Sequence, residues 1–471
     1  MERALCVDLD GTLIRTDLLW EGALALLRSH PLQACMIPFW LLRGKAALKS
    51  EIAKRVTIEA SALPYHGPLL EHLKKECASG RTLVLATASP AGFAGAIAEH
   101  LGLFSRVVAT DGGKNVAGLE KARRLCALFG EKNFDYAGNG RRDVAVWRCS
   151  AEAIVVNSSN RTRRQVAAST KVAACFDGRT ASMGTYMRAI RLHQWIKNFL
   201  VFVPVIAIHR VTDLVLLRPA LIAFLAFSLS ASAAYLLNDL LDLPSDRQHP
   251  DKKLRPLASG ELPIHHVLFL VPVLLGAALG LGCLLTASFL AVLLGYLVVT
   301  VAYSLALKRV AVLDVIVLAG FYTVRIIAGS VATHIPPSFW LLAFSMFLFL
   351  SLALVKRYSE LSLLQRSGSQ NASGRGYRAE DLPILQNLGS ASGYLSVLVL
   401  ALYINSANSQ VYYRHPEAIW FLCPVLLFWI SWIWLKAHRG LIHEDPIIFA
   451  LRDPVSWWAA LLGAIAAWMA I

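Results

Sequence analysis

The first third of the chain shows short apolar runs separated by longer stretches of mixed polarity. Runs of about five residues predict buried β-strands at 3–7, 82–87, 133–137 and 153–157. Helices are expected between them, for example at 67–78 and 117–129. Because strands that alternate with helices form parallel sheets, the pattern predicts a doubly wound α/β domain over residues 1–165.

A mostly helical insertion is expected at about 17–65, after the first strand. It contains an apolar run at 31–42 that is too short to cross a bilayer and includes two prolines. We interpret this run as the core of a cap, with contact to a membrane surface as the alternative. Polar, irregular sequence follows the last expected strand and predicts a linker at 166–184.

Long apolar segments dominate the remaining residues, 185–471. They predict an all-α membrane domain of nine transmembrane helices, at about 194–208, 214–238, 264–284, 286–305, 312–332, 337–355, 390–408, 417–435 and 454–471. Loops after the even-numbered segments hold fourteen Lys and Arg residues, against three on the opposite side. By the positive-inside rule, we expect a multi-pass protein of the bacterial inner membrane with its N-terminal domain in the cytosol.

Composition and charge exclude several classes of protein. Hydrophobic residues make up 56% of the 471 and charged residues 16%, below the ~25% of soluble proteins. Residues 1–180 hold 42 of the 77 charged residues, which excludes one uniform globular protein, a disordered chain and a collagen-like chain. We attribute the net charge of +15 to cytoplasmic loops and anionic lipid, so nucleic acid is not an expected partner. The eight scattered cysteines form no CxxC pair and are expected to be reduced.

Three aspartates follow the second apolar segment at a regular spacing. Asp239, Asp242 and Asp246 stand at i, i+3 and i+7, on one face of a helix that Pro244 is expected to interrupt. Carboxylates this close repel one another unless a cation lies among them, and hard oxygen ligands suit Mg²⁺. Cations that could hold a diphosphate follow directly: Arg247, Lys252, Lys253 and Arg255. The alternative is a solvated polar loop.

Together with Asn238, these residues form an NDxxDxxxD motif that resembles the UbiA-type polyprenyltransferase superfamily, membrane enzymes of nine helices. Further segments resemble its decaprenyl-phosphate phosphoribosyltransferase branch over about 185–471. They contain Arg191, Gln194, Lys197 and Asn198, then Tyr303 and Lys308, then Tyr322 and Arg325, and then Lys356, Arg357 and Glu360. The resemblance implies transfer of 5-phosphoribose from phosphoribosyl pyrophosphate to a polyprenyl phosphate, with aspartate-bound Mg²⁺ neutralising the departing pyrophosphate.

The charge pattern agrees with this narrower resemblance. Arg191, Gln194 and Asn198 are expected on one helix face. Arg325 lies inside an apolar span, where a charge is costly unless it is paired, so it is expected to bind substrate or, alternatively, to pair with an acid. A donor with a diphosphate and a 5-phosphate needs many cations, and the expected pocket holds Lys197, Lys253, Arg255, Lys308, Arg325, Lys356 and Arg357.

The main alternative is a prenyltransferase that moves a polyprenyl group from its diphosphate to an aromatic acceptor. Members of that kind commonly carry a second aspartate pair before the fifth span, where Asp314 stands alone. A non-catalytic membrane protein with a partner-binding soluble part is the second alternative. The sequence is compatible with a homo-oligomer.

The segment Asp8-Leu-Asp10-Gly-Thr12 follows the first strand and resembles the first motif of haloacid-dehalogenase-like phosphatases, a likeness that covers about 1–165. In that family the first aspartate is the nucleophile and the second the general acid and base, with Mg²⁺ between them. Thr87 fits the second motif, and Lys121 fits the third with Lys114 as its competitor. The fourth motif usually reads GDxxxD, but here Asn139 precedes Asp143. Asn139 removes one anion and is expected to weaken Mg²⁺ held by Asp8, Asp10 and Asp143.

The presence of both sites in one chain leads to a hypothesis about their sequence of action. The membrane reaction would leave a 5-phosphate on the lipid-linked ribose at the cytosolic face. We hypothesise that Asp8 removes this phosphate. A degenerate or regulatory α/β domain is the alternative.

Overall fold

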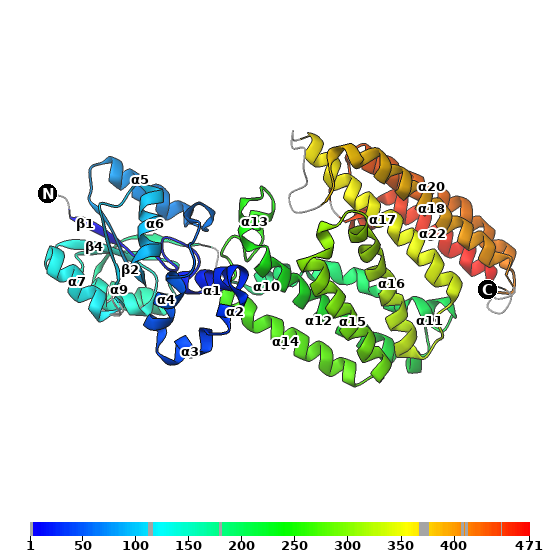
Figure 1. Ribbon diagram of the computed structural model, residues 1–471, viewed down its shortest axis with the longest axis horizontal. Coiled ribbons are helices and arrows are strands. Elements are labelled where there is room, and N and C mark those ends of the chain that lie inside the picture. Colours follow the sequence, from blue (N-terminus) through cyan, green and yellow to red (C-terminus); the bar gives the residue numbers. More distant parts are fainter. Residues whose placement is uncertain are drawn as a thin grey trace. The chain divides into compact units, whose positions relative to one another are not determined.

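The computed structural model describes residues 3–111, 116–178, 181–366, 376–406, 409, 413–443 and 445–471. The chain divides into two compact units (Figure 1). Unit 1 comprises Met1–Ile190 and Tyr235–Val271, and unit 2 comprises Arg191–Ala234 and Pro272–Ile471. The aspartate-rich segment after the second apolar run therefore packs with the N-terminal domain. Two of the three boundaries between the units fall inside long helices, α12 (Leu214–Leu241) and α14 (Ile264–Cys283), and the third lies between Ile190 and Arg191.

Unit 1 is built on a parallel sheet of six strands in the order β3-β2-β1-β4-β5-β6. The strands are β1 (Ala4–Val7), β2 (Leu83–Pro90), β3 (Arg106–Thr110), β4 (Phe134–Gly138), β5 (Glu152–Val156) and β6 (Lys171–Phe176). The four strands expected from apolar runs are confirmed. The two missed strands, β3 and β6, are the edges of the sheet, and β6 alternates exposed with half-buried residues instead of forming an apolar run.

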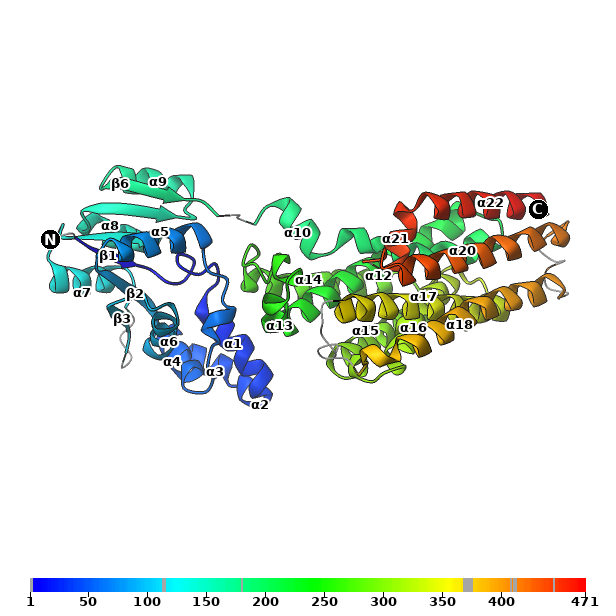
Figure 2. The ribbon, with the colours of Figure 1, turned by 90° about the horizontal axis from the view of Figure 1, so that it is seen from above.

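Helices cover both faces of this sheet (Figure 2). The helices of this part of the chain are α1 (Leu18–Ser29), α2 (Pro31–Ala34), α3 (Ile37–Leu42), α4 (Lys45–Ala53), α5 (Gly67–Ala78), α6 (Ala91–Leu101), α7 (Leu119–Phe129), α8 (Val144–Cys149) and α9 (Asn160–Ala167), with short 3₁₀-helices η1 (Ala60–Ala62) and η2 (Arg141–Asp143). A further helix, α10 (Met183–Ala189), follows the last strand and lies away from the sheet (Figure 2). The helical insertion expected at 17–65 is present as α1 to α4. The expected linker at 166–184 includes regular structure, namely β6 and the start of α10.

Side chains along each strand point alternately to the two faces of the sheet, and an apolar core lies on each face. Leu5 and Val7 of β1 point into a core shared with the helical insertion, which contributes Leu18 and Leu26 from α1. Cys6 points to the other face. Successive side chains of a strand point to opposite faces, so a central strand needs apolar residues at every position. After β1 the chain continues to β2 on one side, and after β4 it continues to β5 on the other. The carboxyl ends of β1 and β4 can therefore carry polar side chains.

Unit 1 also includes the segment after α12, which forms α13 (Leu243–Gln248) and the 3₁₀-helix η4 (Lys252–Leu254). Asp242 is the N-cap of α13, and Pro244 lies in its first turn. The predicted interruption at Pro244 is confirmed, because proline fits the first turn of a new helix but not the interior of a continuing one.

Unit 2 is all-helical. Its elements are η3 (Leu192–Phe202), α11 (Val203–Ala207), α15 (Ala287–Leu305), η5 (Leu307–Arg309), α16 (Leu313–Thr333), α17 (Phe339–Arg366), η6 (Ala379–Asp381), α18 (Leu382–Ile404), η7 (Pro416–Phe421), α20 (Leu422–His438), α21 (Pro446–Arg452) and α22 (Pro454–Ala470).

The described residues contain seven helices long and apolar enough to cross a membrane, or eight if α21 and α22 form one broken span. Nine spans were expected. The first apolar segment folds as the 3₁₀-helix η3 followed by the five-residue α11, and together these are too short. The last segment, α22, has 17 residues and is bent by 86° from α21.

Candidate active sites

The first candidate site lies at the carboxyl end of β1 in unit 1. Asp8 is buried, and its Oδ1 accepts a hydrogen bond from Nζ of Lys121 at 2.6 Å. The hydroxyl of Thr12 lies 3.4 Å from the other carboxylate oxygen. Lys121 comes from α7, so the fold brings together residues 113 positions apart. The expected pairing of these two residues in one site is present.

Asp10, two residues further on, is held on both carboxylate oxygens. Oδ1 accepts from the backbone N–H of Leu18 at 2.9 Å, and Oδ2 accepts from the hydroxyl of Ser89 at 2.5 Å. Thr87 is buried in the same strand as Ser89, and its hydroxyl oxygen accepts from the Ser89 N–H at 3.0 Å. The loop that carries Asp10 is thus fixed both to β2 and to the first residue of α1.

Asp143 completes the polar cluster around Lys121. Its Oδ1 accepts from the hydroxyl of Tyr136 at 2.7 Å and lies 3.6 Å from Nζ of Lys121. Its Oδ2 accepts from the backbone N–H groups of Asn139 and Gly140 at 3.2 and 3.0 Å. Lys114, the competitor of Lys121, lies outside the described residues.

Burial shifts the acid–base properties of this cluster. Burial raises the pKa of Asp8 to about 7, and the ammonium group of Lys121 opposes that rise. Burial also raises the pKa of Asp10, with Asp17 adding to the effect. For Lys121, burial lowers the pKa, but the carboxylates of Asp8 and Asp143 outweigh it and raise the pKa above its ordinary value. The raised pKa favours the protonated form of Asp10 relative to an exposed aspartate.

The donor set here fits Mg²⁺ only in part. Asp8 and Asp143 flank one cationic nitrogen, and Mg²⁺ commonly uses one or two carboxylates together with substrate phosphate. No group of three His, Cys, Asp or Glu side chains suited to a metal occurs in the part of the chain that the structure describes. The Nδ2 atom of Asn139 lies so close to Gly11 that a Cβ at position 11 would meet it at 2.1 Å.

The second candidate site, also in unit 1, surrounds the NDxxDxxxD motif. Nη1 of Arg255 donates to Asp239 Oδ1 at 3.1 Å and to Asp246 Oδ2 at 2.6 Å, and both aspartates are buried. Asp242 accepts instead from Nδ2 of Asn238 at 2.9 Å. Arg255 thus joins two of the three carboxylates, Asp239 of α12 and Asp246 of α13.

These carboxylates fit a divalent cation. Asp239 and Asp246 already place their oxygens around a single positive nitrogen, and two hard carboxylates plus phosphate oxygens suffice for Mg²⁺. Arg255 is about one quarter exposed, so it can move aside or contact a diphosphate. Lys253, the other expected diphosphate ligand, is exposed on η4.

The third candidate site is a buried polar cluster inside unit 2. Lys197 donates from Nζ to Asp445 Oδ2 at 2.6 Å, and Nζ of Lys356 lies 3.5 Å from the same oxygen. The hydroxyl of Tyr322 is 3.3 Å from that oxygen as well. Sequence reasoning missed Asp445. The feature in the sequence that could have identified it is an acidic residue directly before a proline, between the last two apolar segments.

Arg325 extends this cluster through Asn198. Its Nε donates to Asn198 Oδ1 at 2.6 Å, and its Nη1 donates to the carbonyl of Phe321. The guanidinium also lies over the ring of Tyr296, 5.4 Å from the centroid. No carboxylate pairs with Arg325 among the described residues. The structural pairing considered as its alternative is therefore absent there.

Arg357 was expected to bind substrate, but the structure pairs it internally. Its guanidinium lies 2.6 Å from Asp314 Oδ2, and its Nη1 donates to Glu360. The side chains of Arg357 and Asp314 are 1% and 0% exposed, and the hydroxyl of Tyr377 donates to Asp314. Arg357 thus joins α17 to α16.

The remaining expected residues occupy several places. Arg191 precedes η3 with a positive φ of 53°, and Gln194 lies within this 3₁₀-helix. The prediction that Arg191, Gln194 and Asn198 share one face assumed an α-helix. It does not hold for a 3₁₀-helix, which has three residues per turn. Tyr303 lies near the end of α15 with its ring edge against Phe321, and Lys308 lies in η5.

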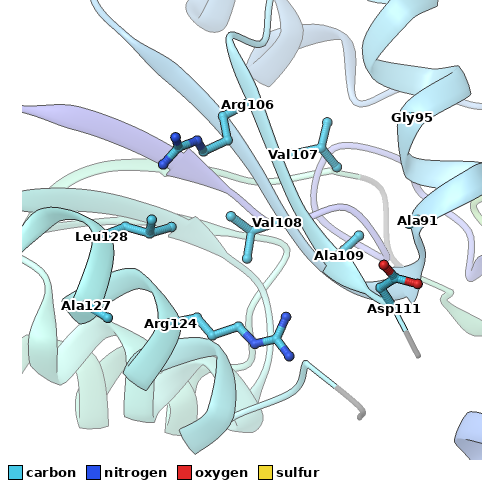
Figure 3. A pocket seen from close by; sticks show the side chains of 10 residues that line it. All are labelled: Ala91, Gly95, Arg106, Val107, Val108, Ala109, Asp111, Arg124, Ala127 and Leu128. Carbon is cyan, nitrogen blue, oxygen red and sulfur yellow. The ribbon is translucent and has the colours of Figure 1, made fainter. Parts of the chain in front are cut away.

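A cavity of about 640 Å³ lies apart from these sites, beside the edge strand β3 (Figure 3). Its lining includes Arg106 of β3 and Arg124 of α7, with Val108 and Leu128 between them (Figure 3). None of the residues expected to be catalytic lines it.

Comparison with known proteins extends these observations. A model of the UbiA prenyltransferase family matches residues 199–446. The uncharacterized protein y4nM of Sinorhizobium fredii (strain NBRC 101917 / NGR234) is 34% identical over 470 residues, which are 99% of this chain and 91% of that protein. The decaprenyl-phosphate phosphoribosyltransferase of Mycolicibacterium smegmatis is 33% identical over 291 residues, 59% of this chain and 91% of that enzyme.

One solved structure aligns with the N-terminal region. A crystal structure of phosphoserine phosphatase in its apo form aligns with a TM-score of 0.27 and 14% identity, over 37% of this chain and 94% of that chain. The family model covers more than half of the chain, and both relatives align over nearly their whole length. The chain therefore belongs to the UbiA prenyltransferase family.

Proposed function

We propose that the chain transfers 5-phosphoribose from phosphoribosyl pyrophosphate to a polyprenyl phosphate in the bacterial inner membrane. The observation that carries this proposal is the polar cluster of unit 2, in which Lys197 and Lys356 both lie close to Asp445 and Arg325 is bonded to Asn198. Clustered cations of this kind are suited to an anionic substrate rich in phosphate. The similarity to the decaprenyl-phosphate phosphoribosyltransferase of Mycolicibacterium smegmatis supports the same function.

The transfer exchanges one bond at C1 of the ribose. The C1–O bond to the diphosphate breaks and pyrophosphate leaves, while an oxygen of the polyprenyl phosphate forms a new bond to C1. Asp239, Asp242 and Asp246 would hold Mg²⁺, which offsets the charge on the leaving pyrophosphate. Arg255 and Lys253 bind diphosphate oxygens. The acceptor is already anionic, so the reaction needs no strong general base.

We further propose that the site of Asp8 removes the 5-phosphate from the lipid-linked product. An oxygen of Asp8 attacks phosphorus, the ribose 5-oxygen leaves with a proton from Asp10, and water then hydrolyses the aspartyl phosphate to inorganic phosphate. Lys121 and Thr87 bind the phosphoryl oxygens. The half-buried carboxyl of Asp10, with its raised pKa, supports the role of proton donor.

The first experiment uses the purified full chain in detergent with Mg²⁺, a polyprenyl phosphate and labelled phosphoribosyl pyrophosphate. A labelled ribosyl lipid, identified by mass, is the expected product. Asp239→Asn should abolish its formation, whereas Asp251→Asn, an exposed aspartate of the same loop, should leave it unchanged. No ribosyl lipid, together with turnover of a polyprenyl diphosphate and an aromatic acid, would replace the proposal by the prenyl transfer that the family name describes.

The second experiment tests the phosphatase step in the same reaction. The wild-type chain should yield a lipid without the 5-phosphate, and Asp8→Asn should yield the lipid heavier by one phosphoryl group. Asp177→Asn, an exposed aspartate after β6, serves as the matched control. Loss of the 5-phosphate at an equal rate in the Asp8 variant would refute this step and leave the transfer proposal intact.

A further inference from the structure

The helical insertion of unit 1 presents an unusual concentration of exposed apolar side chains. Leu32 and Leu42 are 87% and 86% exposed, and Phe39 is 60% exposed. Of the eight large apolar side chains exposed within the described part of residues 3–178, six lie between positions 27 and 42: Leu27, Leu32, Met36, Phe39, Leu41 and Leu42. Contiguous apolar surface of this kind marks an interaction site.

The fold determines which side of this segment faces outward. Trp40 of α3 is buried in the core of the insertion, where the guanidinium of Arg55 covers its ring at 4.7 Å. Phe39 and Leu42 flank Trp40 in the sequence and point to the outside. Helices α2 and α3 form the edge of the insertion away from the sheet (Figure 2).

Helix α1, directly before α2, contacts the ends of two candidate membrane spans within unit 1. Arg28 of its last turn donates to the carbonyl of Leu240, at the end of α12. Near its start, Trp20 stacks on His265 at the beginning of α14, with ring centroids 6.1 Å apart. Glu21, between them, accepts from Arg247 of α13. Since His30 ends α1 and begins α2, the exposed apolar residues follow directly after the helix that contacts the ends of these two spans.

Charge around the patch matches the surface of a membrane. Residues 22–50 contain Arg28, Arg43, Lys45 and Lys49 but no aspartate or glutamate. Arg43 and Lys45 are exposed next to Leu42. Basic residues beside exposed apolar helices are typical of segments that lie in the interface of anionic lipid bilayers.

We propose that α2 and α3 insert their apolar side chains into the bilayer that α12 and α14 cross, and thereby hold the helical insertion on the membrane surface. The two helices together are too short to span the bilayer, so they lie in its interface. Arg43 and Lys45 contact anionic headgroups at the edge of the inserted patch.

Spin-label accessibility tests this proposal on the full chain in nanodiscs of phosphatidylcholine and phosphatidylglycerol. A nitroxide is placed at Leu42→Cys in a chain whose own cysteines are replaced by serine. Leu119→Cys is the matched control, because Leu119 is 69% exposed on α7 of the same unit. The ratio of collisions with oxygen to collisions with a water-soluble nickel chelate should be several-fold higher at position 42 than at 119. Equal ratios would overturn the proposal, as would spin–spin broadening at position 42, which would mean that a second copy of the chain covers the patch.

A second measurement needs no substitution. The wild-type chain in the same nanodiscs, doped with a phospholipid that carries a photoreactive group in its acyl chain, is irradiated and digested. Adducts should map to peptides containing residues 31–42 as well as to the membrane spans. Adducts confined to the spans would contradict the proposal even if the cysteine-free variant failed to fold.

Discussion

Replacing Arg357 by methionine distinguishes two roles for its guanidinium, substrate binding and structural pairing. The sequence indicated a substrate ligand, whereas the structure pairs the guanidinium with Asp314. In the variant, Asp314 would stay fully buried with the hydroxyl of Tyr377 as its hydrogen-bond donor. Removing one member of a buried ion pair costs about 3–5 kcal/mol, since the remaining charge has lost its compensation. We expect a corresponding loss of resistance to unfolding.

The double variant Arg357→Met, Asp314→Leu removes the uncompensated charge as well. An apolar replacement of a buried pair is commonly neutral. Here the Tyr377 hydroxyl loses its acceptor, which costs about 1–3 kcal/mol, so the double variant should recover most of the lost stability without reaching the wild type. Arg366→Met, an exposed position in the last turn of the same helix, should change stability by about 0.5 kcal/mol or less.

The assay combines unfolding of the purified chain in mixed micelles of increasing sodium dodecyl sulfate with formation of the ribosyl lipid. A structural role predicts that the double variant regains stability and transfer together. A double variant that is stable but has no transfer activity would show that Arg357 acts on substrate. A double variant as unstable as the single one would refute the ion-pair argument.

Three further predictions follow from close contacts and burial. Gly329→Ala should destabilise the chain by about 1–3 kcal/mol in the same unfolding assay, because its Cβ would meet the backbone oxygen of Val201 at 2.0 Å; Gly320→Ala, which meets nothing within 4 Å, is the control and should be tolerated. Glu21→Gln should cost about 1.5–3 kcal/mol, since Arg247, which donates to it at 2.6 and 3.1 Å, would remain buried without a carboxylate, whereas Lys171→Gln in a surface pair should have no measurable effect. Cys6 should resist N-ethylmaleimide at pH 8 while the exposed Cys175 reacts, because burial raises the pKa of the Cys6 thiol to about 12 and leaves almost no thiolate; peptide mapping by mass spectrometry measures both, and equal labelling would contradict the buried position of Cys6.

Local sequence signals were sufficient for the central elements of unit 1. Strands β1, β2, β4 and β5 are apolar at nearly every position because helices cover both faces of a parallel sheet. The edge strands β3 and β6 lack this signal, since an edge strand carries exposed residues. The site of Asp8 could be anticipated because its motif directly follows a strand, and the carboxyl ends of parallel strands meet at one edge.

The sequence by itself determined the division into a charged α/β region and an apolar helical region, the break at Pro244, and the motifs at Asp8 and Asp239. Only the tertiary structure decided which charges meet. Lys197 pairs with Asp445, 248 positions away, and Arg357 pairs with Asp314, so one expected substrate ligand forms a buried ion pair and one unexpected acid joins the cluster. Helix periodicity fixes neighbours three or four residues apart, but pairing between distant segments depends on how whole helices pack against one another.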